Sequence, residues 1–265
     1  MSRRTTKART IVCILFETFY SFPIIEVVVS GLLFLSVYFM ANASLSNTFR
    51  LVPAPGSPFV GVFLDIIEQS VINALCVSLL NLSSLLALLI PLLVAFSFAR
   101  LIETGLLRTY LSYPIGRCST LVLSVLLVLA VVVAPITLGL TLSVYIFNPY
   151  FPPVDSFVLA ATALCLFTLL TVSLTLLLSL LSKSVLATSI GGVGLSYAML
   201  GAGAYYEAPA YAVAAINPLE FTVRYLTGNG PPTDLGGVLL GLSGSVLIIV
   251  LALVLCVFTV QRMEV

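Results

Sequence analysis

Charge is scarce in this chain of 265 residues: 8% of the residues are charged, while 60% are hydrophobic. Ordinary globular domains carry about 25% charged residues. A water-soluble domain needs many more ionic side chains to cover its surface, so this composition argues against a soluble enzyme. The near balance of 11 basic and 10 acidic residues also argues against a nucleic-acid partner, which would favour a basic surface.

Histidine is absent altogether. Its absence excludes His-dependent zinc sites, bis-His haem sites and Ser-His or Cys-His catalytic pairs. The sequence also contains no G-x-x-x-x-G-K-S/T, so it carries no nucleotide-binding P-loop. The three aspartates fall in expected loops, which excludes a pair of intramembrane aspartates: Asp65, Asp155 and Asp234. We therefore expect no enzyme activity, no cofactor and no metal site in this chain.

What the sequence does contain is six long apolar runs. A helix rises about 1.5 Å per residue and the hydrocarbon core of a bilayer is about 30 Å thick, so about 20 apolar residues span it. The runs are continuous, as in helices, and do not alternate with polar residues. They predict an all-α polytopic membrane protein that forms a single transmembrane domain over residues 1–265. The predicted spans are residues 23–40, 71–98, 120–144, 157–181, 185–204 and 238–260.

The basic residues predict the orientation of these spans. If both termini are cytoplasmic, nine of the 11 basic residues lie on the cytoplasmic side and only Arg50 and Arg224 lie outside. Such a bias is typical of cytoplasmic loops. We therefore expect a multi-pass protein of the cell membrane. The nine are Arg3, Arg4, Lys7, Arg9, Arg100, Arg108, Arg117, Lys183 and Arg262.

Two segments outside the spans have helical character. Residues 1–21 form a cytoplasmic tail whose polar residues follow one stripe, which predicts an amphipathic helix in the membrane interface. On the outer side, residues 205–235 contain two apolar stretches that are too short to span a membrane and are separated by Asn217-Pro218. They predict two short interfacial or re-entrant helices broken at Pro218.

The connection between the second and third spans, residues 99–118, holds four charges where the neighbouring spans hold none. Its pattern predicts a short helix from Glu103 to Leu111 along the membrane surface, ended by Pro114 and Gly116. A rigid helix between two spans can transmit a push from a cytoplasmic partner into both of them.

The run Glu103-x-Gly105, followed by Leu111, Pro114 and Arg117, resembles the signature of type-2 ABC transporter permeases. The six spans, the N-terminal elbow helix and the two short outer helices before the last span also fit that family. One departure is the pair Thr109-Tyr110, where the family often has acidic or polar residues.

The resemblance implies the permease subunit of an ATP-driven exporter. Such a subunit pairs with a second permease chain, identical or related, and with two cytoplasmic ATP-binding subunits. The missing P-loop is then expected, because ATP is hydrolysed on a separate chain. The residues implied to contact the ATPase are Glu103, Gly105, Arg108, Leu111, Pro114 and Arg117.

Polar residues within the spans allow two interpretations each. Glu26 lies near the cytoplasmic end of the first span, where it can reach the interface or act as a polar gate. Asn73 and Asn81 of the second span can bond a neighbouring helix or line a path. Gly192 and Ser196 continue a repeat of small residues, every fourth position, that starts at Thr188 and suits close helix packing or the wall of a path.

Two other functions compete with the permease. A structural or assembly subunit of another membrane complex would have the same composition. A secondary carrier usually shows ionisable residues at mid-membrane, whereas this chain offers only Glu26 near an edge.

Overall fold

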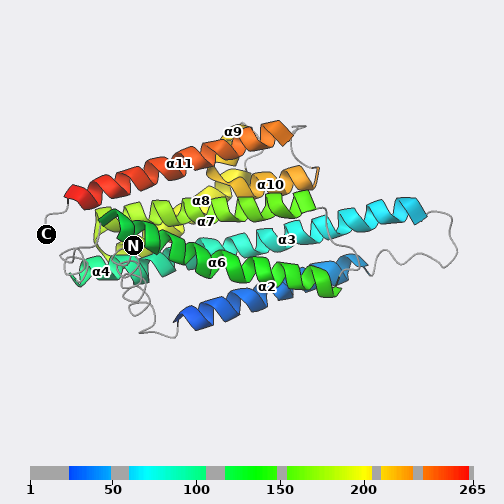
Figure 1. Ribbon diagram of the computed structural model, residues 1–265, viewed down its shortest axis with the longest axis horizontal. Helices are drawn as coiled ribbons and strands as arrows, with labels where there is room; N and C mark the ends of the chain where they lie inside the picture. The colour runs from blue at the N-terminus through cyan, green and yellow to red at the C-terminus, as the bar shows by residue number, and fades with distance from the viewer. Residues whose placement is uncertain are drawn as a thin grey trace, which may run out of the picture.

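The computed structural model describes residues 24–48, 60–105, 117–147, 154–204, 210–228 and 235–262, and all regular structure in these ranges is helical (Figure 1). The predicted tail helix in residues 1–21 lies outside this part of the chain. The helices are α2 (Ile24–Thr48), α3 (Val60–Val94), the π-helical turn η1 (Ala95–Ala99), α4 (Arg100–Glu103), α6 (Arg117–Phe147), α7 (Val154–Ser182), α8 (Val185–Ala204), α9 (Ala210–Ile216), α10 (Pro218–Leu226) and α11 (Leu235–Arg262).

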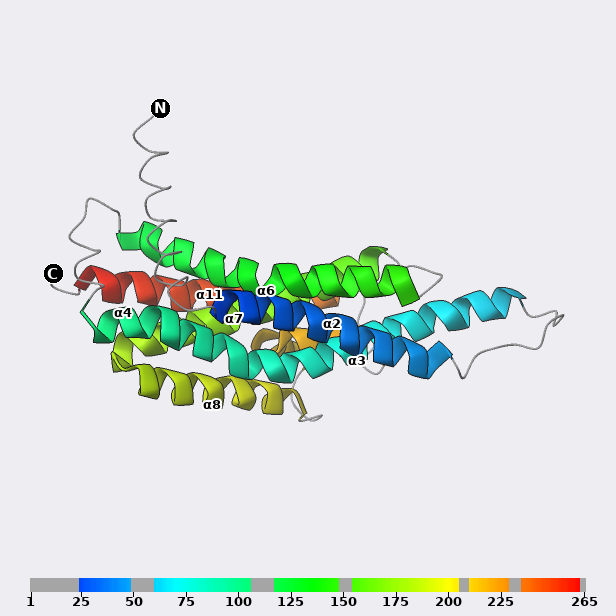
Figure 2. The same ribbon diagram turned by 90° about the horizontal axis from the view of Figure 1, so that it is seen from below.

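Six of these helices are long and apolar enough to cross a membrane, which confirms the predicted all-α, multi-pass architecture. They lie side by side along the long axis of the molecule and alternate in direction (Figure 1). One end of the bundle, here called the Glu103 end, contains the start of α6 and α8 and the last turn of α4, α7 and α11, whereas α2 begins further along the bundle (Figure 2). The opposite end, here called the Asn217 end, contains α9 and α10.

The helices extend further than the apolar runs. We expected the first span to end at Met40 and the second to begin at Val71, but α2 continues to Thr48 and α3 begins at Val60. Asp65 and Asp155, which we expected in loops, lie in helices, Asp65 in α3 and Asp155 in the first turn of α7. Hydropathy marks only the part of a helix that fits the hydrocarbon layer. The backbone of α3 continues because no proline lies between Pro58 and Val71 to stop it.

The second span is one uninterrupted helical segment from Val60 to Glu103, made of α3, η1 and α4. Pro91 lies inside α3, and the π-helical turn begins four residues later. Proline cannot donate a backbone hydrogen bond, and its ring clashes with the carbonyl of the preceding turn. A proline followed by a π turn is a common origin of helix bends. The segment from Pro91 to Ala99 is therefore the expected place for a bend in this span.

The central helix is α7, which contacts α3, α6, α8, α10 and α11. Its fully buried threonines donate to carbonyls of their own helix: Thr168 to Leu164 at 2.8 Å, and Thr175 to Thr171 at 2.7 Å. Buried hydroxyls in a membrane helix can be satisfied by this local bond and need no second helix. A hydroxyl-rich helix can therefore lie at the centre of the bundle.

Helices α2 and α6 pack closely through small residues. A Cβ added to Gly139 of α6 would lie 3.0 Å from the carbonyl oxygen of Leu33 and would overlap the side chain of Ser36. One turn along α6, the buried Ser143 hydroxyl donates to Gly139 O at 2.8 Å and lies 3.4 Å from Val37 O of α2. Small residues allow two membrane helices to approach until dispersion contacts hold them.

Replacing Gly139 by alanine is therefore expected to destabilise the protein by about 1–3 kcal/mol, because the added methyl group forces α2 and α6 apart. Gly31→Ala in α2 is the matched control, since nothing lies within 4 Å of a Cβ added there. Alanine favours a helix over glycine by up to about 1 kcal/mol, so the control should unfold no earlier than wild type. Thermal unfolding of both purified variants in one detergent measures the difference, and coincident midpoints would contradict the packing.

Candidate functional site

The second span ends at Glu103. The N–H and the hydroxyl of Thr104 both bond the carbonyl of Arg100, at 3.0 and 2.8 Å, and Gly105 N donates to Ile102 O at 3.1 Å. Gly105 has φ +74°, a left-handed conformation in which a side chain is strained. A glycine in this conformation directly after a helix is a common helix terminator.

This geometry corrects one prediction. We expected a surface helix to begin at Glu103, but Glu103 is the last residue of α4, and Gly105 turns the chain away from the helix. Arg117, which we expected between the spans, is the first residue of α6. The other residues of the family-like run, Arg108, Leu111 and Pro114, lie outside the described residues.

The Glu103 carboxylate contacts the start of α8. Its Oε2 accepts a hydrogen bond from Val185 N at 3.0 Å, across 82 positions of sequence. Ser184 O accepts from Thr188 N at 3.1 Å, the first bond of α8, so Ser184 is the N-cap and Val185 is the first helical residue. The first N–H groups of a helix lack partners within it and favour a nearby negative charge. Glu103 thus caps a helix that is far away in sequence.

The turn between α7 and α8 is short and shaped to allow this contact. The predicted spans left Ser182, Lys183 and Ser184 between them, and the structure assigns Ser182 to α7, so that the turn consists of Lys183 and Ser184. Lys183 has φ +53°, which is unusual for a residue with a side chain. The hydroxyl of Thr188 donates to Ser184 O at 2.8 Å and lies 3.0 Å from the Ser182 hydroxyl. These bonds fix the turn that presents Val185 N to Glu103.

Two turns further along α8, Gly192 lies against both neighbouring helices. A Cβ added there would lie 2.9 Å from Pro91 Cβ of α3 and 2.9 Å from Thr175 Cγ2 of α7. The buried Ser196 hydroxyl donates to Gly192 O at 2.8 Å. The small face of α8 is therefore used for packing within this chain, and its close contact with α3 lies at Pro91, shortly before the π turn.

The outward face of α3 carries a polar stripe, here defined as Asn73, Asn81 and Ser84. Asn81 and Ser84 are exposed and Asn73 is half-buried. Asn73 Oδ1 lies 3.5 Å from the donor Gln69 Nε2, whereas no hydrogen bond to the Asn81 amide is found within the described residues. Helix α3 contacts both α2 and α8 and runs between them (Figure 2). The stripe therefore has a helix on either side.

Helix α8 borders the stripe through Tyr197, whose hydroxyl donates to Ser84 O at 3.1 Å. Asn81 lies near the middle of the segment from Val60 to Glu103. Exposed amide groups halfway along a membrane helix are unfavourable toward lipid, because lipid tails offer no hydrogen-bond partner. The stripe is therefore a candidate contact surface, for a second chain or for a transported molecule.

Glu26 lies in the first turn of α2, and its side chain is exposed. Ser30 Oγ donates to Glu26 O at 2.5 Å. An acidic residue in the first turn of a helix is favoured by the helix dipole. This position agrees with a structural role at the start of α2, although α2 begins further along the bundle than the end of α4 (Figure 2).

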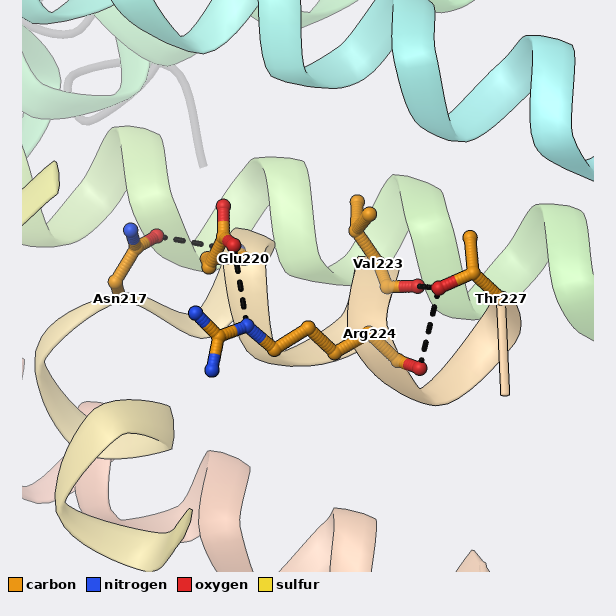
Figure 3. Close-up of polar contacts among 5 residues, drawn as sticks. All are labelled: Asn217, Glu220, Val223, Arg224 and Thr227. Carbon is orange, nitrogen blue, oxygen red and sulfur yellow. Dashed lines mark hydrogen bonds and ion pairs between the residues drawn. The ribbon is translucent and has the colours of Figure 1, made fainter. Parts of the chain in front are cut away.

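At the other end of the bundle, Asn217 and Pro218 separate α9 from α10, as the sequence predicted. Asn217 Oδ1 accepts from Glu220 N at 3.2 Å, and Pro218 occupies the first helical position (Figure 3). Within α10, Arg224 Nε and Glu220 Oε1 form an ion pair at 3.2 Å. Both short helices are too short to span a membrane.

The short helices pack against the last span. Ser245 Oγ of α11 donates to Ala214 O of α9 at 2.7 Å, and a Cβ added to Gly241 would lie 2.8 Å from Ala214 Cβ. Sequence reasoning did not anticipate that Asn217 Nδ2 and the Thr222 hydroxyl are buried without a hydrogen-bond partner among the described residues. Such orphaned groups cost free energy, so Asn217 is retained here for the acceptor that caps α10.

Sequence reasoning also missed Val185 and Tyr197. Val185 acts through its backbone N–H, which any residue other than proline provides, so no side chain marks it. Tyr197 follows an apolar stretch in which nothing distinguishes a lipid-facing ring from one that bonds a neighbouring carbonyl. A charged residue next to a helix-ending glycine, as in Glu103-x-Gly105, was the one available signal that α4 ends at this point.

No protein-family model, curated protein or solved structure matches this chain. A functional assignment therefore rests on its own residues and contacts.

Asn217→Ala is expected to loosen α10, because Glu220 N loses its acceptor at a cost of about 0.5–2 kcal/mol. Asn217→Ser restores an N-cap acceptor without the orphaned amide and should retain most of the stability. Amide hydrogen exchange of the α10 backbone distinguishes the two variants: the first turn should exchange faster in Asn217→Ala than in Asn217→Ser. Equal exchange in both would show that the Asn217 cap does not hold α10.

Proposed function

We propose that this chain is the permease subunit of an ATP-driven ABC transporter, an exporter that works as a dimer of permease chains with separate ATPase subunits. The observation that carries the proposal is the continuous helical segment from Val60 to Glu103, which ends where the charged, family-like connection begins. A continuous helix that crosses the bilayer and leads into a charged connection is suited to carry a displacement from a partner to the opposite side.

The distribution of charge supports a cytoplasmic Glu103 end. Of the basic residues that the structure describes, four lie at the Glu103 end, and Arg224 alone lies at the Asn217 end. Basic residues flanking spans favour the cytoplasmic side. The ATPase would then bind at the Glu103 end, where it would contact Gly105, Arg108, Leu111, Pro114 and Arg117. The four basic residues are Arg100, Arg117, Lys183 and Arg262.

The polar stripe supports a dimer with a path at its centre. Across a two-fold axis, Asn81 of one copy can face Asn81 of the other, and each amide offers both a donor and an acceptor. Such contacts remove from lipid the amides that lipid cannot bond. A path along the same face would have an apolar wall interrupted by a few amide and hydroxyl groups.

A secondary carrier is less well supported. Apart from Glu26, which lies in the first turn of α2, every charged residue that the structure describes lies toward one end of the bundle or the other. Ion-coupled carriers usually hold ionisable groups at mid-membrane. A structural subunit of another complex is the competing function that the following experiment tests.

Purification of the tagged chain from its native membranes is expected to bring down a P-loop ATPase. Arg108→Ala combined with Arg117→Ala should strongly reduce the amount of ATPase recovered, because both charges lie in the connection assigned to the contact. Arg262→Ala is the matched control, since it removes an exposed basic residue from α11 at the same end of the bundle. Purification with other membrane proteins and no ATPase would contradict the permease and favour the structural subunit.

Cross-linking tests the dimer face. In a variant whose five native cysteines are replaced by alanine, Asn81→Cys is expected to form a covalent dimer with a short thiol cross-linker in native membranes. Thr141→Cys is the control: Thr141 is also exposed, on α6, but its hydroxyl already donates to Thr137 O at 2.7 Å. Dimers formed through position 141 and not through position 81 would assign the interface to α6 instead.

A further inference from the structure

We propose that Glu103 is a positioning residue that ties the cytoplasmic end of α8 to the end of α3 and α4, so that the two helices move together when the connection after Gly105 is displaced. The role in transport rests on the proposed function, whereas the tie itself does not. The resemblance assigns Glu103 to the ATPase contact. Its carboxylate is instead engaged within the chain, by Val185 N at 3.0 Å.

Chain connectivity and packing point to different partners for α3. In sequence, the connection leads from α4 to α6. In space, α3 contacts α8 far more extensively than α6. A displacement that enters at Glu103 therefore reaches α8 through packed side chains, while it reaches α6 chiefly through the chain after Gly105.

Contacts between α3–α4 and α8 occur at three levels along the two helices. At the Glu103 end, Glu103 bonds Val185 N. Further along, Pro91 packs against Gly192, where no larger side chain fits. Beyond that, the Tyr197 hydroxyl bonds Ser84 O at 3.1 Å. The π-helical turn η1 lies between the first level and the second, and it also contacts α8. The Glu103 bond extends this contact to the last turn of α4.

Two substitutions break this bond from opposite sides. Glu103→Ala removes the acceptor, while Val185→Pro removes the donor and leaves the carboxylate free for any other partner. Proline is favoured at the first position of a helix, so α8 is expected to fold normally in Val185→Pro. Glu103→Gln keeps an acceptor oxygen and loses the charge. Leu235→Pro, at the first residue of α11, is the matched proline control.

The bond between Glu103 and Val185 N is tested first on the chain alone, in lipid nanodiscs. The measurement is amide hydrogen exchange of the first turn of α8. Glu103→Ala is expected to raise the exchange rate about tenfold or more over wild type, with Glu103→Gln between the two. Unchanged exchange in Glu103→Ala would overturn the tie. This measurement needs no ATPase, so it stands even if wild type purifies without one and the permease proposal fails.

The role in coupling is tested in the complex with its ATPase. Two reporters are compared in the cysteine-free background: an environment-sensitive fluorophore at Leu186→Cys on α8, and one at Val122→Cys on α6, both exposed positions. Trapping with ATP and vanadate is expected to change both signals in wild type and in Leu235→Pro. In Glu103→Ala and Val185→Pro the α8 signal should lose its response, while the α6 response and ATPase recovery remain.

The ATPase-contact role makes the opposite prediction. If the Glu103 charge binds the ATPase, Glu103→Ala and Glu103→Gln should both lose the ATPase on purification, and Val185→Pro should behave as wild type. The double variant Glu103→Ala with Val185→Pro adds a further check. If Glu103 links the two helices through Val185 N, the double variant responds like either single variant, because both substitutions remove the same bond. Additive losses in the double variant would overturn this proposal.

Discussion

The constraint on which this structure depends is that the hydrocarbon interior of a membrane offers no hydrogen-bond partners. It requires each span to be a helix, and it requires each hydroxyl within a span to bond inside the protein. Thr175 and Ser196 do so by donating to the preceding turn of their own helix. Because most polar groups are satisfied locally in this way, those that are not stand out. Two of them, the exposed amide of Asn81 and the carboxylate of Glu103, lie on the second span.

The two exceptions have different physical consequences. Asn81 lies near the middle of its span, where an amide facing lipid is unfavourable, so its position favours a surface that another molecule covers. Glu103 lies at a helix end, where a carboxylate can remain charged in contact with the headgroup region while it accepts from Val185 N. A charge at the end of one helix is thereby used at the start of another. The stripe and the cap lie on the same helical segment, so a movement at one is transmitted through α3 to the other.

The spans could be predicted from the sequence because hydropathy reports burial in lipid directly, and the break at Asn217-Pro218 could be predicted because proline favours a first helical turn. The helix boundaries could not, since a helix continues beyond the lipid until a residue stops it. The start of a surface helix at Glu103 was predicted wrongly for a related reason. The φ of +74° at Gly105 ends α4 at Glu103, while the residue pattern alone also allowed a helix to begin there. The partner of Glu103 is a backbone N–H 82 positions away, and no periodicity encodes such a pair.

The residues of the family-like run therefore differ in whether contacts within the chain already account for them. Glu103 is held by α8, and Gly105 is required by its backbone conformation, so neither needs an ATPase to explain its identity. Basic residues of the connection have no such internal explanation in the sequence: Arg108 lies among apolar residues, and a charge at that position suits a soluble partner. On the proposed function, such a segment has a base fixed by α8 at Glu103 and its partner contact beyond Gly105. Pro91 and the π turn lie between this base and the polar stripe, so a movement of the base would reach the stripe through them.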